Sequence, residues 1–297
     1  CSTFISIGAR LDNITTAYNV KLFARNATEK WVLDVDENQL EVCDLKDAKK
    51  LQIDLKYALE YLQNKKDLEE KSEWIQHCNW LKEKYSTCDG KIPQDKYKFT
   101  HFEAAKLLSD ALPERSIIIT GSSGLAIEAF YVAYEPKKSQ RILLTSGLGA
   151  MGYGLPAYLG ALEALDEDSK KILIESDGSL MLNLQELQTL KTRNKKNLKI
   201  IILNNQGYCS IRATQKNYFK GNFVASNKNS GLEIPNLRNI SNAFGFKYYS
   251  FEKSDKNNLK KILQTEGNTL IDIKIVEEEA LWPKVSVISK EDGSLVS

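Results

Sequence analysis

Short apolar runs alternate with longer amphipathic segments along most of this chain. The runs are rich in isoleucine and leucine and lack regular polar positions, which is typical of strands buried on both faces of a parallel sheet. Strands are predicted at residues 117–120, 142–145, 171–176, 198–204, 246–249 and 269–276, with helices between most of them. This alternation predicts an α/β fold with a doubly wound parallel sheet.

The segment that joins the strands at 171–176 and 198–204 has the spacing of one helix. Its apolar positions recur every three or four residues, at Leu180, Leu184, Leu187 and Leu190. Asn183 with Glu186 three residues later resembles a capping box. The helix is therefore predicted to begin just after the turn Asp177-Gly178-Ser179.

The amino-terminal part has another pattern. Residues 4–10 form a strand that runs into a glycine turn, whereas residues 46–108 are charged, poor in glycine and helical in their spacing. Turn residues make 89–93 the best linker candidate. The pattern thus predicts three parts, at residues 1–45, 46–95 and 96–297.

Polar residues stand where two neighbouring strands end. Asp177 follows the strand at 171–176, and Asn205 follows the strand at 198–204. The carboxyl ends of neighbouring parallel strands face one crevice, so these side chains can converge. Mg²⁺ prefers such oxygen ligands, and the backbone N–H groups of Gly178 and Ser179 are suited to an anion at a helix start. We expect a site for a diphosphate bridged by a divalent metal.

These residues resemble the cofactor motif of the thiamine diphosphate enzymes, within which the acetolactate synthase-like group is most similar. The family motif is Gly-Asp-Gly, a spacer and Asn-Asn, and here it stands as Ser176-Asp177-Gly178 and Asn204-Asn205. Ser176 departs from the first glycine of the motif. The resemblance implies that Mg²⁺ is bound by the side chains of Asp177 and Asn205 and by the carbonyl of Gly207.

A second stretch, residues 145–156, resembles the family segment that bends the cofactor into a V shape, and Met151 falls on its bulky position. Residues 121–128 and 210–215 resemble a subgroup associated with surface-polysaccharide gene clusters. The positions that the resemblance places at the cofactor are Gly121, Ser122, Ser123, Gly149, Met151, Gly178, Ser179, Tyr208, Ser210 and Ile211.

The resemblance covers nearly the whole chain and gives the three parts their meaning. Residues 1–45 resemble part of a Rossmann-like central domain, 46–95 a helical connector, and 96–297 the diphosphate- and Mg²⁺-binding domain. Gly8, Arg10 and Asp12 are the residues that we tie to a possible FAD. Because residue 1 is cysteine and the carboxyl end resembles a shortened tail, we expect a truncated chain.

The family members decarboxylate a 2-oxo acid and use the cofactor for the hard chemistry. Pyruvate is the expected donor, and the acyl carbanion would pass to a second 2-oxo acid or a keto-sugar nucleotide. Thr214 stands where acetolactate synthases carry a bulky aromatic, which leaves room for a larger acceptor, although it is equally compatible with simple helix packing. A simple 2-oxo acid decarboxylase and an inactive cofactor-binding fragment remain alternatives.

The family's activating glutamate belongs to a pyrimidine-binding domain that this sequence does not match. No catalytic residue can therefore be assigned in this chain, and we expect the isolated polypeptide to release no carbon dioxide from pyruvate. Active sites of the family form between subunits, so the resemblance implies a homodimer or homotetramer.

The strongest competing interpretation is an NAD-binding Rossmann protein. Gly147 to Gly152 match the pattern GxGxxG after the strand at 142–144, and Glu175 stands where an acidic residue could bind a ribose. This interpretation leaves Asp177-Gly178-Ser179 and the asparagine pair without a role. Either motif alone would be an ordinary turn, so the order and spacing of both favour thiamine diphosphate.

Composition narrows the classes further. The formal net charge of +2 on 297 residues gives no electrostatic case for nucleic acid, and no apolar run is long enough to cross a membrane. Five cysteines without metal spacing, at 1, 43, 78, 88 and 209, predict free thiols in a reducing, cytoplasmic compartment. With only two histidines, His77 and His101, no histidine acid/base mechanism is expected.

Overall fold

The computed structural model describes residues 2–13, 15–16, 19–64, 71–85, 99–145, 147–165, 169–281, 288–289 and 295–296. The chain divides into two compact units, Cys1–Lys84 with Lys284–Ser297, and Tyr85–Pro283. The predicted linker at 89–93, Cys1 and Cys88 lie outside the described residues. Of the described cysteines, Cys43, Cys78 and Cys209 are free thiols.

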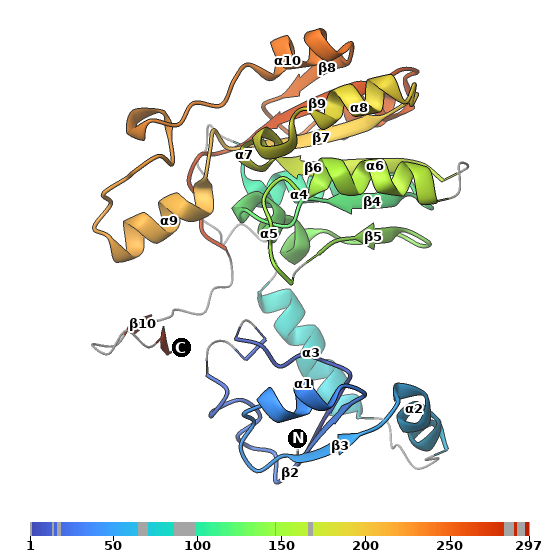
Figure 1. Cartoon of the computed structure of the whole chain (residues 1–297), viewed down its shortest axis with the longest axis vertical. Coiled ribbons are helices and arrows are strands. Elements are labelled where there is room, and N and C mark those ends of the chain that lie inside the picture. The colour runs from blue at the N-terminus through green and yellow to red at the C-terminus, as the bar shows by residue number, and fades with distance from the viewer. Residues whose placement is uncertain are drawn as a thin grey trace. The chain divides into compact units, whose positions relative to one another are not determined.

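The second unit is built on one parallel sheet of six strands, as the apolar runs predict (Figure 1). The strands pair in the order β5-β4-β6-β7-β9-β8, and every pair is parallel. Their bounds are β4 Ile117–Thr120, β5 Arg141–Leu143, β6 Lys171–Ser176, β7 Lys199–Asn204, β8 Lys247–Phe251 and β9 Thr269–Lys274. The chain winds outward in both directions from β4 and β6, so a topological switch point lies between these two strands.

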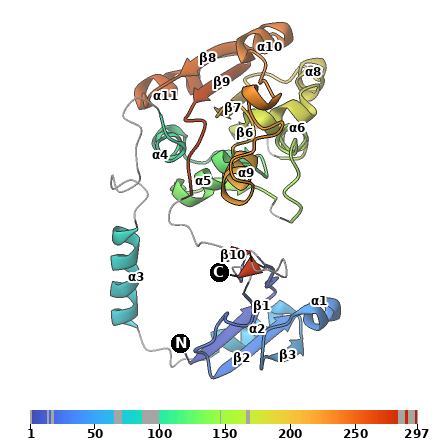
Figure 2. The ribbon, with the colours of Figure 1, turned by 90° about the vertical axis from the view of Figure 1, so that its left-hand side faces the viewer.

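Helices cover both faces of this sheet, which confirms the doubly wound α/β fold. One face carries α4 (His101–Ala111), α5 (Leu125–Ala133) and α11 (Lys256–Gln264), and the other carries α6 (Gly154–Ala164), α8 (Glu186–Thr192) and α10 (Leu237–Phe244). Figure 2 shows the two helical layers on either side of the strands.

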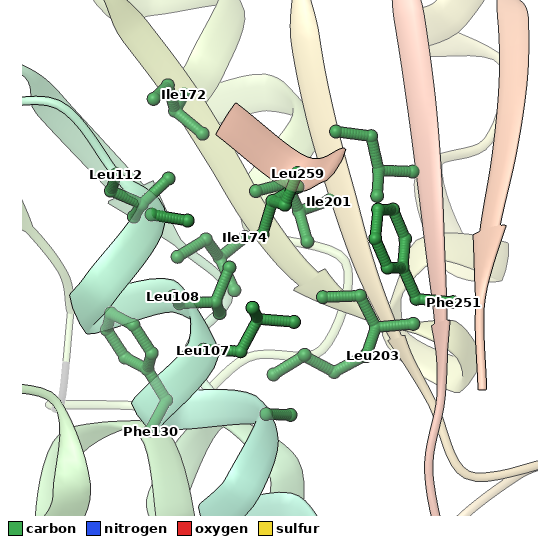
Figure 3. Close-up of a cluster of buried hydrophobic side chains, with 14 of the residues drawn as sticks. Leu107, Leu108, Leu112, Phe130, Ile172, Ile174, Ile201, Leu203, Phe251 and Leu259 are labelled. Atoms are coloured by element: carbon green, nitrogen blue, oxygen red, sulfur yellow. The ribbon is translucent and has the colours of Figure 1, made fainter. Parts of the chain in front are cut away.

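Side chains of the central strands point alternately to the two layers. Ile174 and Leu203 pack with Leu108 and Phe130 beneath α4 and α5, as Figure 3 shows, whereas Leu173 and Ile202 pack beneath α6 and α8. Both faces of β6 and β7 are therefore buried, which explains why their sequences are continuous apolar runs rather than alternating ones.

Helix α4 begins with a complete capping box. The Thr100 hydroxyl accepts from the backbone N–H of Glu103, 3.1 Å away, and the Glu103 carboxylate accepts from the backbone N–H of Thr100 at 2.8 Å. We expect Thr100→Ala to lower the free energy of unfolding by about 1 kcal/mol, because it removes the partner of a helix-terminal N–H. Urea unfolding would measure the change. Thr192→Ala, at an exposed position in the last turn of α8, should change it by less than about 0.5 kcal/mol, and equal losses would contradict the role of the cap.

The connection after β6 differs from the predicted single helix. Asp177–Leu180 form a short helix, α7, and Met181–Asn183 a 3₁₀ turn, η1, before α8 begins at Glu186. The predicted capping box is wrong, because α8 has no side-chain cap at its start. The Asn183 amide instead donates to the Gly152 carbonyl at 2.8 Å, so a bond to a distant loop replaces the local one.

The first unit contains a three-stranded parallel sheet in the order β1-β2-β3, formed by Thr3–Ile7, Glu29–Asp34 and Lys49–Gln52. Its helices are α1 Glu37–Val42, α2 Leu55–Gln63 and α3 Ser72–Lys84. Strand β3 corrects the helical prediction for the start of the segment 46–95. All four of its residues are exposed, so no apolar alternation marks it, and only backbone pairing with β2 defines it.

Two short strands near the carboxyl end, β10 (Ile288–Ser289) and β11 (Leu295–Val296), pair antiparallel. Within the described residues, no helix is both long and apolar enough to cross a membrane.

Candidate active site at the carboxyl edge of the sheet

The structure joins the two predicted metal-binding segments directly. Asp177 follows β6 and starts α7, and its Oδ1 accepts from the backbone N–H of Gly178 at 2.8 Å. Its Oδ2 accepts from the backbone N–H of Gly207, which follows β7, at 3.0 Å. Two amides from two loops thus fix the carboxylate at the carboxyl edge of the sheet.

Asp177 is a buried carboxylate whose hydrogen bonds do not offset the effect of burial on its pKa. It is 0% exposed, and burial raises its pKa to about 7 although the N–H groups of Gly207 and Gly178 and the charge of Arg212 act in the opposite direction. A cation bound beside the carboxylate would favour its ionised form, because an opposite charge nearby lowers a carboxyl pKa.

Asn205 has a buried amide oxygen that finds no hydrogen-bond partner in the described part of the chain. Its Nδ2, by contrast, lies 3.2 Å from the ring Nε2 of His101. The neighbouring Asn204 is engaged differently, since its Nδ2 donates to Asp272 at 3.0 Å and its Oδ1 accepts from the backbone N–H of Gln206. Only the second asparagine of the pair therefore offers an oxygen to a ligand.

Unpaired buried polar atoms gather at this edge. In the part of the chain that the structure describes, they are Ser123 Oγ, Asn205 Oδ1, Ser210 Oγ, Arg212 Nε and Glu279 Oε1. All five belong to segments that follow the carboxyl ends of β4, β7 and β9. Buried polar atoms are nearly always paired, so a concentration of exceptions marks a place where a polar ligand or ordered water can complete the bonding.

The donor set fits a magnesium ion that is shared with phosphate oxygens. One carboxylate, one amide oxygen and one backbone carbonyl leave positions of an octahedron for phosphate or water. Among the described residues, no three His, Cys, Asp or Glu side chains gather into a metal site. A site that uses only one acidic residue is consistent with this finding.

Glycines at the site are required by close contacts. A Cβ on Gly178 would lie 2.6 Å from the Tyr208 ring and 3.5 Å from the Gly207 carbonyl oxygen. A Cβ on Gly121 would lie 2.0 Å from Oε1 of Glu175, and one on Gly154 would lie 2.2 Å from Oε2 of the same residue. These glycines therefore allow the Tyr208 ring and the Glu175 carboxylate to pack directly against the backbone of the site.

Glu175 is a buried residue that fixes the backbone around the site. Its carboxylate is 1% exposed and accepts from the backbone N–H groups of Gly154 at 3.0 Å and of Ser176 at 2.9 Å. Burial raises its pKa to about 7. Because this carboxylate lies beneath Gly121 and Gly154, it cannot reach a ribose, and the NAD interpretation loses its acidic residue.

The predicted cofactor residues of the glycine-rich loops lie together. The Ser122 hydroxyl donates to the Ala150 carbonyl, and the Ser179 hydroxyl accepts from the backbone N–H of Gly152 at 2.7 Å. Gly149, which directly precedes Ala150 in the loop after β5, has a positive φ of 60°. These bonds tie the loop after β4, the loop after β5 and the start of α7 to one another.

The remaining predicted cofactor residues are more accessible. Met151 and Tyr208 are half-buried, and Ile211 is exposed on α9 (Cys209–Tyr218), which also carries Ser210. Their contacts with a cofactor stay predictions. The residues tied to FAD lie in the first unit, and flavin binding also stays a prediction. Gly8 directly follows β1, has a φ of 57°, and donates its backbone N–H to the Leu33 carbonyl at 2.8 Å.

Three residues at this edge were not predicted from the sequence. The Arg212 guanidinium is 2% exposed and donates to the carbonyls of Ser226 at 2.7 Å, of Asn205 at 3.0 Å and of Glu277. The ring of His101 lies between Asn205 and Glu279. No local signal marks these residues, since His101 is 104 positions from Asn205 and 178 from Glu279.

A separate cavity of about 360 Å³ lies at the opposite, amino edge of the sheet. Its lining includes Lys170, Lys171 and Lys199, and the Lys199 ammonium is already bonded to the carbonyls of Thr265 and Gly267. None of the predicted site residues lines this cavity. The candidate site is therefore assigned to the carboxyl edge, where the unpaired polar atoms lie.

Comparison with known proteins agrees with this geometry. The family model described as "Thiamine pyrophosphate enzyme, C-terminal TPP binding domain" matches residues 120–273. The large subunit of acetolactate synthase isozyme 2 from Escherichia coli (strain K12) is 30% identical over 96% of this chain and 50% of its own length. The acetolactate synthase large subunit of Cyanidium caldarium is 28% identical over 96% of this chain and 48% of its own.

The fold also recurs in a solved structure, a thiamine diphosphate-dependent 4-hydroxybenzoylformate decarboxylase from Rhodococcus jostii RHA1. It is 17% identical, with a TM-score of 0.62 over 86% of this chain and 45% of that one. The chain spans about half the length of the curated relatives it matches. By its matched domain and these relatives, the chain belongs to the thiamine diphosphate-dependent enzymes, in their acetolactate synthase-like group.

Proposed function

We propose that this chain binds the diphosphate of thiamine diphosphate through Mg²⁺ and forms that part of an acetolactate synthase-like enzyme. The observation that carries the proposal is the buried amide oxygen of Asn205, which has no partner among the described residues. Asp177 and Asn205 would hold the cation through their side chains, and Gly207 would hold it through its carbonyl. A buried polar atom of this kind gains most from a ligand that completes its bonding.

The residues of the chain contribute binding and orientation. The amides of Gly178 and Gly207 hold both oxygens of Asp177, so the carboxylate needs little reorganisation to bind a cation. The missing side chain of Gly178 leaves room for the ring of Tyr208 beside the Gly207 carbonyl, so this glycine contributes to the packing of the loop that would hold the cation. Met151 would support the bent form of the cofactor from the loop after β5. The bound cofactor supplies the electron-accepting ring that decarboxylation of a 2-oxo acid requires.

For the reaction, we propose decarboxylation of pyruvate and transfer of the acyl carbanion to an acceptor. The likeness to two acetolactate synthases supports a second 2-oxo acid as this acceptor. Thr214 supports a larger one, a keto-sugar nucleotide, because its small side chain is exposed on α9 and its hydroxyl is turned back to the Ser210 carbonyl at 3.1 Å.

Calorimetric titration of the 297-residue chain would test the cofactor part of the proposal. We expect thiamine diphosphate to bind in the presence of Mg²⁺ and to lose its binding when EDTA is added, because the cation bridges protein and diphosphate. NAD serves as the control ligand and should release no heat of binding. Binding of NAD, or binding of thiamine diphosphate that is indifferent to EDTA, would refute the proposal.

A further inference from the structure

We propose that His101 and Glu279 are positioning residues for the cation. Together they hold the side-chain amide of Asn205 so that its oxygen, and not its nitrogen, is presented to Mg²⁺. The inference rests on the proposed function, since it concerns how the same site holds its metal.

The three residues form a buried chain of hydrogen bonds between separate elements. Glu279 follows β9, His101 is the first residue of α4, and Asn205 follows β7. Oε2 of Glu279 lies 2.7 Å from the ring Nδ1 of His101, and the ring Nε2 lies 3.2 Å from Nδ2 of Asn205. The side chains of His101 and Glu279 are only 0% and 7% exposed, so water does not compete for these bonds.

This order of partners determines which atom of Asn205 is free. An ionised carboxylate only accepts hydrogen bonds, so Glu279 requires a proton on Nδ1 of His101. In the neutral imidazole the other nitrogen then accepts, and Asn205 must turn its NH₂ group toward it. The amide oxygen is left unpaired, as observed. A reversed amide would set its oxygen against the lone pair of Nε2.

Glu279, at the far end of this series of hydrogen bonds, is itself held in place. Besides the ring, the backbone N–H of His101 donates to the same Oε2 of Glu279, at 2.7 Å. The carboxylate therefore sits at the amino terminus of α4, where the helix dipole favours a negative charge. Partners that orient a metal ligand from behind commonly decide the affinity of the site, because they remove the orientations in which the ligand cannot bind.

A purely structural role makes a different prediction. If these bonds only fasten α4 to the segment after β9, their loss should lower the stability of the protein but leave the cation affinity of the folded protein unchanged. The test therefore measures affinity directly, by calorimetric titration of Mg²⁺ into the chain with inorganic pyrophosphate as the diphosphate probe. Thermal unfolding without metal reports stability separately.

Paired variants at both positions provide the comparison. His101→Leu and Glu279→Met remove the bonds, and we expect each to weaken Mg²⁺ binding about 10- to 100-fold. His101→Gln and Glu279→Gln keep an accepting oxygen within reach, and we expect both to stay within about threefold of the unsubstituted chain, in contrast to the removal of such partners. His77→Leu is the matched control, because His77 is exposed between the rings of Trp74 and Trp80 and lies in the other unit.

The outcomes separate this inference from the proposed function. If the unsubstituted chain binds Mg²⁺ and pyrophosphate and the folded Leu or Met variants bind them equally well, the inference is wrong and the proposed function stands. If the Gln variants weaken Mg²⁺ binding as much as the Leu and Met variants do, an accepting oxygen at these positions does not set the affinity, and the inference is also overturned. If the unsubstituted chain itself does not bind, both fail. Should His101→Leu not fold, the Glu279 pair decides.

Discussion

Replacing Asp177 with asparagine is expected to abolish the Mg²⁺-dependent binding of a diphosphate to this chain. The variant keeps the shape of the side chain but removes the only carboxylate among the three proposed ligands, which are Asp177, Asn205 and Gly207. We expect an affinity loss of at least about 100-fold, the upper end of what groups that merely orient a ligand contribute. Calorimetry with Mg²⁺ and inorganic pyrophosphate would measure it, and an affinity within tenfold of the unsubstituted chain would show that Asp177 does not bind the cation.

Without metal, Asp177→Asn is expected to raise the stability of the protein at alkaline pH, although it weakens cation binding. The pKa of Asp177 in the folded chain is raised from its ordinary value of 3.8 to about 7, so folding favours the protonated form. The resulting stabilisation is present at acidic pH and is lost as the pH rises through about 7. In EDTA, the stability of Asp177→Asn relative to the unsubstituted chain should therefore be higher at pH 8 than at pH 5, by roughly 2 kcal/mol. Urea unfolding at both pH values would detect this change, and a pH-independent difference would contradict it.

Replacing Arg212 with methionine is expected to cause a large loss of stability. The guanidinium joins the carbonyls of Asn205, Ser226 and Glu277, which come from three separate segments. Each buried carbonyl left without a partner costs about 1–3 kcal/mol, and removal of a buried charge offsets part of the sum. We expect a net loss of about 3 kcal/mol in the free energy of unfolding, measured with urea.

Lys216→Met provides the control for Arg212→Met on the same helix, α9. The Lys216 side chain is 65% exposed and pairs with Glu278 at 3.1 Å. Exposed ion pairs contribute little, so we expect a change below about 0.5–1 kcal/mol. If the two variants lost similar stability, the three hydrogen bonds of Arg212 would not stabilise the fold as we infer.

The strands of the second unit could be predicted because burial on both faces leaves an unmistakable apolar run. The predicted strand at 171–176 coincides with β6, for example, and the one at 117–120 with β4. The proximity of Asp177 and Gly207 was predictable for a related reason, since parallel neighbouring strands bring their carboxyl ends to one edge. Strand β3 had no such signal, because its residues are exposed and only its backbone is engaged.

The features of the site that sequence reasoning missed depend on side chains whose partners are distant in the sequence. Asn183 was predicted to cap a helix, but it bonds to Gly152 across the sheet edge. Glu175 matched a ribose-binding position, yet the backbone of Gly154 and Ser176 occupies its carboxylate. His101 was judged from its place beside a connector, and its actual partners come from distant parts of the sequence. Such contacts are determined by the packing of the whole unit.

The segment after β9 is hydrogen-bonded to the end of β7, to α9 and to the start of α4. The backbone N–H groups of Ile275 and Val276 donate to the carbonyls of Asn204 and Phe99, both at 2.9 Å. The Glu277 carbonyl accepts from the Arg212 guanidinium, and the Glu279 carboxylate is bonded to the His101 ring. If the proposed cation binds at Asp177 and Asn205, its binding and the order of this segment are coupled reciprocally: the factor by which the cation stabilises the segment equals the factor by which the ordered segment strengthens cation binding. Under the proposed function, the stretch 275–279 would therefore influence the affinity for the cation without contributing a ligand.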